Sequence, residues 1–189
     1  QALQHIGAVI EEPVAFSKLS AYENMKIICI QKGIHDYAVI DEMLDFVNLA
    51  NTGKKKFKNF SLGMKQRLGI AMALVNNPDF LILDEPINGL DPIAIIEFRE
   101  LLEKINQERN TTILISSHIL TELYQVSTRF GFIHQGEVIQ QLSKDDFDAL
   151  CTEDIIIKVD DIKRASALLQ ENVPAPFTVV NDHELRIHD

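Results

Sequence analysis

Apolar and polar residues follow one another along the chain in patterns that predict short strands and amphipathic helices. The segment 5–10 is predicted to be a strand that ends before Pro13, because proline disfavours continuation of a regular element. Apolar residues recur at helical spacing over 20–31 and 36–49, and Asp36 is the expected N-cap of the second helix. The first 50 residues therefore predict one strand followed by two helices.

The middle of the chain alternates between helices and strands. We predict a helix from Ser61, a strand over 80–83, a helix that starts at Asp91, a strand over 111–115 and then another helix. The 80–83 run is apolar throughout, as expected of a parallel strand that is covered on both faces. Strands that alternate with helices predict an α/β fold with a largely parallel sheet.

The last third of the chain predicts smaller units. A hairpin is expected over 129–141 with its turn at Gly136, and a β-α-β-β pattern follows over 155–187. We therefore divide the chain into a main domain, residues 1–150, and a small α/β appendage, residues 151–189. The appendage carries no motif to which we assign chemistry.

The composition is that of a folded globular protein. Of 189 residues, 46% are hydrophobic and 24% are charged, which excludes a disordered or collagen-like chain. The formal charge of −10 disfavours broad contact with nucleic-acid phosphates. Cys29 and Cys151 form no CxxC pair, which argues against a disulfide framework or a zinc knuckle. No apolar run approaches the ~18 residues that a membrane-spanning helix needs.

Two acidic residues close the predicted strand 80–83. A carboxylate at the carboxyl end of a buried parallel strand lies where α/β sheets bind ligands, so Asp84 is a candidate ligand for a Mg²⁺ ion that bridges nucleotide phosphates. Glu85, one residue later, suits a group that orients or deprotonates a water attacking the γ-phosphate. The plainer interpretation is that two acids simply end a strand.

Two further segments are candidates for contact with phosphate. Ser61 and Gly63 stand at the start of an amphipathic helix, where unpaired N–H groups and the helix dipole attract anions. His118 follows the end of the next strand, where it could donate a hydrogen bond to a phosphate oxygen or to the attacking water. The plainer alternatives are an ordinary serine N-cap and a surface or core histidine.

Together these motifs resemble those of the ATP-binding cassette (ABC) ATPases, over about residues 4–142. The motifs that carry the resemblance, in order, are a signature-like motif at 60–64, a Walker B motif at 80–85, a D-loop at 89–91 and a switch histidine at His118. The resemblance implies a P-loop NTPase-like ABC ATPase fold, with a helical signature subdomain over about 14–76.

The resemblance also implies ATP and Mg²⁺ as cofactors and a role for each candidate residue. Asp84 looks like the magnesium carboxylate, Glu85 like the general base and His118 like the γ-phosphate sensor. The residues implied to bind ATP, held by a partner subunit, are Ser61, Gly63, Met64 and Asp91.

The signature departs from the family's usual Leu-Ser-Gly-Gly-Gln. Phe60, Leu62 and Met64 replace three of its five residues, which leaves Ser61 and Gly63 to supply the anion site. In the run 60–71, which contains this departure, and in the run 6–13, the chain is similar to the ATPases of bacitracin-resistance and lantibiotic-immunity exporters.

Glu11 stands where most cassettes carry the Q-loop glutamine, as it does in those immunity ATPases. A second acid beside a triphosphate is repulsive unless Mg²⁺ is present. We therefore hypothesise that Glu11 is a catalytic residue and a further metal ligand that couples metal and water occupancy to the transmembrane partner. The alternative is that Glu11 is a solvated loop acid and that Glu12 is the true match, one residue along.

The P-loop motif G-x-x-x-x-G-K-[ST] does not occur in this sequence. Its Gly-Lys pair, Gly53-Lys54, lacks the upstream glycine and the following hydroxyl residue. The family places the P-loop upstream of the point where Gln1 begins, so we expect an N-terminal truncation with weak ATP binding by the chain as given. Strands missing from the sheet would leave apolar surface open, and we expect low solubility or non-native association.

The resemblance implies the ATP-hydrolysing subunit of a bacterial ABC exporter for peptide antibiotics, peripheral on the cytoplasmic face of the membrane. The expected partners are a transmembrane permease subunit, received by residues 24–30 and the loop before them, and a second ATPase subunit in a homodimer. Nucleic acid is not an expected partner. The alternatives are a soluble ABC ATPase in translation or DNA repair, and a non-catalytic interaction module.

Overall fold

The computed structural model describes residues 5–150, 154–173 and 175–188. Contacts within the chain divide it into two units, Gln1–Val126 and Ser127–Asp189. The second unit contains both the predicted hairpin and the predicted appendage. The boundary that we expect at residue 150 stays a prediction, and Cys151 lies outside the described residues.

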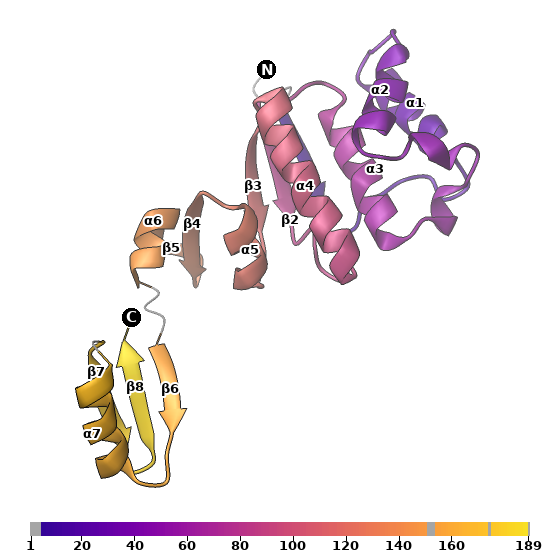
Figure 1. Cartoon of the computed structure of the whole chain (residues 1–189). Helices are drawn as coiled ribbons and strands as arrows, with labels where there is room; N and C mark the ends of the chain where they lie inside the picture. The colour runs from indigo at the N-terminus through magenta and orange to yellow at the C-terminus, as the bar shows by residue number, and fades with distance from the viewer. Residues whose placement is uncertain (1–4, 151–153, 174, 189) are drawn as a thin grey trace. The chain divides into compact units, whose positions relative to one another are not determined.

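The first unit is built on a parallel sheet. Strands β1 (Ile6–Ile10), β2 (Phe80–Asp84) and β3 (Thr112–Ser116) pair in the order β1-β2-β3. All the strands in this sheet run parallel, so their carboxyl ends meet at one edge (Figure 1). The α/β pattern read from the sequence is confirmed here.

Between β1 and β2 the chain forms the predicted helical segment. Helix α1 (Ala21–Gln31) is capped by Ser20, and α2 (Ala38–Phe46) follows it. The expected cap of α2 is wrong by one residue: Tyr37 is the N-cap, and the Asp36 carboxylate accepts the Ala38 N–H at 3.0 Å from one position further out. The remaining elements of this segment are the 3-10 turns η2 (Ala50–Thr52) and η3 (Phe57–Asn59) and helix α3 (Leu62–Leu74).

Helix α4 (Pro92–Arg109) connects β2 to β3, and α5 (Leu120–Val126) follows β3. Asp91 caps α4, and Pro92 occupies its first turn, where a missing N–H costs nothing. The helix ends at Asn110, which adopts a left-handed conformation with φ 52°. Local sequence signals thus fix both ends of α4.

The two faces of the sheet differ in burial. On one face Leu81 and Leu83 are fully buried in a core shared with α3 and α4. On the other face Ile10 is 61% exposed and Leu114 is 55% exposed. The expectation that the 80–83 strand is covered on both faces is therefore wrong for the described residues, because its alternate residues Phe80 and Ile82 are only half-buried.

In its described residues the second unit holds two further sheets, whose strands agree with the predicted hairpin and β-α-β-β pattern, whereas the helix over 144–150 was not predicted. The hairpin turns at Gln135 and Gly136, both with positive φ, as a tight hairpin turn requires. Strand order in the other sheet is β6-β8-β7, all antiparallel. The elements are β4 (Arg129–His134), β5 (Glu137–Ser143), α6 (Lys144–Leu150), β6 (Asp154–Lys158), α7 (Ile162–Asn172), β7 (Phe177–Asn181) and β8 (Glu184–His188).

None of the helices in the described part of the chain combines the length and the apolar character that crossing a bilayer demands.

Candidate functional site

The carboxyl edge of the parallel sheet gathers several of the predicted site residues. Ile10, Asp84 and Ser116 occupy one row across the strands, since Ile10 pairs with Asp84 and Asp84 pairs with Ser116. Glu11 and Glu85 each follow a member of this row directly. In parallel α/β sheets this edge is where ligands bind.

Asp84 and Glu85 are both held by Ser116, at the end of the neighbouring strand. The Ser116 hydroxyl donates to Asp84 Oδ1 at 2.5 Å and accepts the Glu85 N–H at 3.1 Å. The same Glu85 N–H lies 3.2 Å from the Ser116 carbonyl oxygen. Ser116 is a site residue that sequence reasoning missed, and its position as a hydroxyl at the end of a strand is the signal that could have identified it.

Glu85 and His118 form a direct contact on the same edge. Glu85 Oε2 lies 2.9 Å from His118 Nδ1, an ion pair when the imidazole is protonated. The Glu85 side chain is 32% exposed and that of His118 is 64% exposed, so both remain open to solvent. The structure thus brings Asp84, Glu85 and His118 into one constellation, while their individual roles stay predictions.

Glu11 lies at the same edge, at a bend where the chain leaves β1. Its φ of 53° is left-handed, and its backbone carbonyl accepts a hydrogen bond from Gln66 Nε2 of α3 at 3.5 Å. Among the described residues, no hydrogen bond or ion pair joins the Glu11 carboxylate to Asp84. Glu12 is also exposed, so the choice between Glu11 and Glu12 stays open.

The signature residues form a separate group where α3 and α4 begin. Ser61 caps α3 by accepting the Met64 N–H at 3.3 Å, and Asp91 caps α4 by accepting the Ala94 N–H at 2.9 Å. A Cβ on Gly63 would lie only 3.2 Å from that of Ala94, so the two helix starts pack closely. Among the described residues, no hydrogen bond joins this group to Asp84.

Lys55 lies beside the signature group, with its ammonium 3.7 Å from Met64 Sδ. The same ammonium stands 5.9 Å from the centre of the Phe60 ring. A positive charge therefore flanks the start of α3, where the helix dipole also favours anions.

The donor set at the sheet edge suits magnesium better than a transition metal. Asp84 offers carboxylate oxygens and Ser116 a hydroxyl, whereas the described residues contain no cluster of three or more His, Cys, Asp or Glu that could hold a metal. Mg²⁺ is commonly bound by one or two carboxylates, with phosphates and water supplying the remaining ligands. The residues present therefore fit a magnesium ion that arrives with a nucleotide.

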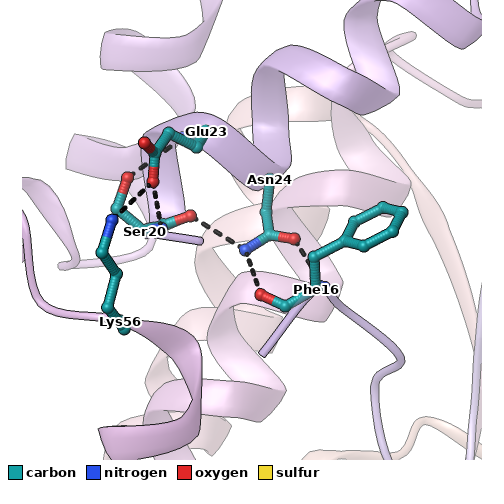
Figure 2. A network of polar contacts seen from close by, with 5 residues as sticks. All are labelled: Phe16, Ser20, Glu23, Asn24 and Lys56. Atoms are coloured by element: carbon teal, nitrogen blue, oxygen red, sulfur yellow. Dashed lines mark hydrogen bonds and ion pairs between the residues drawn. The ribbon is translucent and has the colours of Figure 1, made fainter. Parts of the chain in front are cut away.

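A second polar network orders the loop before α1 (Figure 2). The buried Asn24 accepts the Phe16 N–H at 2.8 Å and donates to the carbonyls of Phe16 (3.3 Å) and Ser20 (2.9 Å). Ser20 and Glu23 form a capping box, and the Glu23 carboxylate pairs with Lys56 at 3.0 Å. This network fixes the backbone of Phe16, although the residue as a whole is 59% exposed to solvent.

Several of these features affect the pKa of Glu23. Its carboxylate accepts the Ser20 N–H at 2.6 Å, and this hydrogen bond, followed by that from Lys56, lowers the pKa of Glu23 from 4.5 to about 2.

Cys29 lies in the core of the first unit, where burial raises the pKa of its thiol above the ordinary value. Cys29 is therefore a protonated core side chain at neutral pH rather than a nucleophile.

Comparison with known proteins gives consistent matches. The ABC transporter family model matches residues 1–88. The chain is 42% identical over 189 residues to the bacitracin transport ATP-binding protein BcrA of Bacillus licheniformis, covering all of this chain and 62% of that protein. It is 48% identical over 143 residues to the lantibiotic transport ATP-binding protein SrtF of Streptococcus pyogenes, covering 76% of this chain and 62% of that one.

A third relative and a solved structure extend the match. The ABC transporter ATP-binding protein YhcH of Bacillus subtilis (strain 168) is 33% identical over 209 residues, covering all of this chain and 68% of YhcH. The dimeric post-hydrolysis structure of the ATP-binding cassette MJ0796 with ADP and Pi superimposes with a TM-score of 0.63 at 27% identity, covering 74% of this chain and 62% of that one. The chain spans about 60% of the length of the bacitracin and lantibiotic relatives.

The resemblance and the ABC ATPase fold read from the signature, Walker B and switch-histidine motifs are confirmed by these matches. On sequence and fold alike, the chain belongs to the family of ABC transporter ATP-binding proteins.

Proposed function

We propose that this chain is part of the ATP-hydrolysing subunit of a bacterial exporter for peptide antibiotics of the bacitracin or lantibiotic type. The observation that carries the proposal is the constellation of Asp84, Glu85 and His118 at one edge of a parallel sheet. The choice of cargo is supported by the two relatives whose names specify bacitracin and lantibiotic transport.

In the proposed mechanism, Asp84 is the carboxylate that holds Mg²⁺ at the nucleotide. The ion, when bound, supplies positive charge that offsets the charge on the phosphates. Glu85 orients the attacking water and accepts its proton. For this role the Glu85 carboxylate lies within hydrogen-bond reach of the water, as a general base must. His118 contacts Glu85 in the structure and is assigned the hydrogen bond to the γ-phosphate.

The proposal requires a second ATPase subunit. Ser61 already accepts the Met64 N–H, yet its hydroxyl proton is still available to a phosphate oxygen, because a hydroxyl both donates and accepts. The start of α3 and the nearby Lys55 ammonium add positive potential. We assign Ser61, Gly63, Met64 and Asp91 to contact ATP bound by the partner subunit, in a homodimer.

Of residues 24–30, which we expect to receive the permease, Asn24, Met25 and Cys29 are buried, so the surface that we assign to the transmembrane permease subunit is the loop before α1. Val14 is 90% exposed and Phe16 is 59% exposed, while Asn24 fixes the backbone that presents Phe16. Apolar side chains on an ordered loop suit contact with a cytoplasmic segment of a membrane protein. This contact would hold the subunit at the cytoplasmic face of the membrane. The proposal includes no nucleic-acid partner.

The proposal is tested by ATP hydrolysis in the intact gene product carrying Glu85→Gln. We expect the rate to fall about 100-fold or more, because the amide cannot accept a proton, while ATP binding persists. Glu103→Gln is the matched control, since Glu103 is exposed on α4 away from the constellation. Equal rates in the two variants, or a wild-type protein without Mg²⁺-dependent hydrolysis, would contradict the proposed function.

A further inference from the structure

Ser116 lies between the two acidic residues and contacts both of them. Its hydroxyl donates to Asp84 Oδ1 at 2.5 Å and accepts the Glu85 N–H at 3.1 Å. A serine hydroxyl carries one proton and two acceptor positions, so one side chain can make both contacts at once. We propose that Ser116 is a positioning residue that orients the Asp84 carboxylate for the divalent cation and fixes the backbone at Glu85. This inference rests on the proposed function.

Strand pairing explains why this particular serine can orient Asp84. Asp84 and Ser116 are partners in the β2-β3 register, so their side chains point to the same face of the sheet. The hydrogen bond occupies Oδ1 of Asp84, and among the described residues Oδ2 accepts no hydrogen bond. The carboxylate is thus fixed through one oxygen and leaves the other for a cation. Partners that orient a metal ligand in this way typically change metal affinity about 10- to 100-fold.

The contact with the Glu85 N–H acts on an unusual backbone. Glu85 has a φ of 46°, a left-handed conformation that is unfavourable for a non-glycine residue. Its N–H is shared between the carbonyl oxygen and the hydroxyl of Ser116, which stabilises this conformation. The two carboxylates then have separate partners, Asp84 with Ser116 and Glu85 with His118.

The next serine along the chain provides a matched control. The Ser117 hydroxyl accepts the Ile119 N–H at 3.0 Å, a local contact within the turn after β3. Within the described part of the chain, Ser117 makes no hydrogen bond to Asp84 or Glu85. A role that depends on the register with Asp84 therefore distinguishes Ser116 from a serine one residue away.

The test measures cation affinity directly, with Mn²⁺ as the probe. The intact gene product is titrated with Mn²⁺ in the presence of a non-hydrolysable ATP analogue, and free Mn²⁺ is followed by electron paramagnetic resonance. We expect Ser116→Ala to weaken nucleotide-dependent Mn²⁺ binding about 10- to 100-fold. Ser116→Thr, which keeps the hydroxyl, should restore affinity to within a few-fold of wild type, and Ser117→Ala should leave it unchanged.

Thermal unfolding of each variant shows whether it folds, and Ser116→Cys, a weak donor of similar size, replaces the alanine variant if that variant does not. Wild-type Mn²⁺ affinity in Ser116→Ala, or an equal loss in Ser117→Ala, would overturn the inference while the proposed function stands. A wild-type protein that binds no Mn²⁺ with the nucleotide would overturn both. Loss of affinity in Ser116→Ala with rescue by threonine supports the positioning role.

Discussion

At the scale of single residues, the two acids at the sheet edge, Asp84 and Glu85, have different hydrogen-bond partners. Two carboxylates that are adjacent in sequence would repel each other if both faced one point, because like charges interact unfavourably at short distance. Here Asp84 is bound to Ser116, and Glu85 contacts His118. In the proposed mechanism, this division lets Asp84 act toward a metal and Glu85 toward water.

The hypothesis for Glu11 predicts an effect of Glu11→Gln in the intact gene product. If the carboxylate is a metal ligand, its removal should raise the Mg²⁺ concentration for half-maximal ATP hydrolysis about 10-fold and reduce transport. ATPase assays over a range of Mg²⁺ concentrations, with transport measured in parallel, check this. Glu12→Gln is the control. A larger effect of this variant would favour Glu12, rather than Glu11, as the residue that stands in the place of the Q-loop glutamine. Unchanged hydrolysis and transport in Glu11→Gln would remove the hypothesis.

The capping box at α1 predicts a pH-dependent contribution to stability. The folded-state pKa of Glu23 is lowered to about 2, so the stabilisation is fully present above the ordinary pKa of 4.5 and is lost as pH falls from about 4.5 toward 2. The difference in unfolding free energy between wild type and Glu23→Gln should therefore shrink over this range in urea titrations. Glu103→Gln should show no such trend, and parallel curves for wild type and Glu23→Gln would contradict the prediction.

At the scale of elements, the close approach of α3 to β1 depends on glycine. A Cβ on Gly69 of α3 would lie 2.6 Å from Pro13 Cγ, and a Cβ on Gly7 of β1 would lie 2.9 Å from the Ala73 carbonyl oxygen. The helix that begins at Ser61 thus packs against the bend that contains Glu11 and Pro13. Gln66 adds a polar contact to the same bend.

This packing predicts that Gly69→Ala destabilises the protein, even though alanine is the better helix former. Overpacking costs about 1–3 kcal/mol, and approaches of 2.6 Å and 2.7 Å to two ring carbons of Pro13 place this clash in the upper part of that range, above the ~1 kcal/mol gained in helix propensity. Urea unfolding measures the difference. Gly131→Ala is the control, because among the described residues a Cβ at this position would lie within 4 Å of no heavy atom outside its two chain neighbours. A Gly69→Ala variant as stable as wild type would show that α3 can move away from β1.

On the scale of the whole chain, the open face of the parallel sheet has consequences for behaviour in solution. Ile10 and Leu114 are more than half exposed on this face, while the opposite face is packed under α3 and α4. Exposed apolar side chains on one face of a sheet favour association with other chains.

We therefore predict that the 189-residue chain by itself associates in a concentration-dependent way. The double variant Ile10→Lys, Leu114→Lys should shift the distribution toward monomer in sedimentation velocity, because charge on this face opposes contact. Ile133→Lys, at an exposed position of β4 in the other unit, should leave the distribution largely unchanged. A wild-type chain that stays monomeric at tens of micromolar would contradict the prediction.

The elements predicted from the sequence agree well with the structure where local rules decide. Ser20, Ser61 and Asp91 each cap the helix that follows, and the turn at Gly136 joins a hairpin. Capping and turn formation involve residues within about one turn of each other, so a linear sequence contains the necessary information. Asp36 is a partial exception, because its carboxylate caps the helix from one residue outside the N-cap.

By itself, the sequence determined the alternation of strands and helices except for helix α6, the positions of Asp84, Glu85 and His118 at strand ends, and the family. Only the tertiary structure decided that Ser116 holds both acids, that Glu85 contacts His118 across 33 positions of sequence, and that one sheet face is left open. The physical reason is range: caps and periodicity act between near neighbours, whereas strand register and the covering of a face depend on contacts between distant segments.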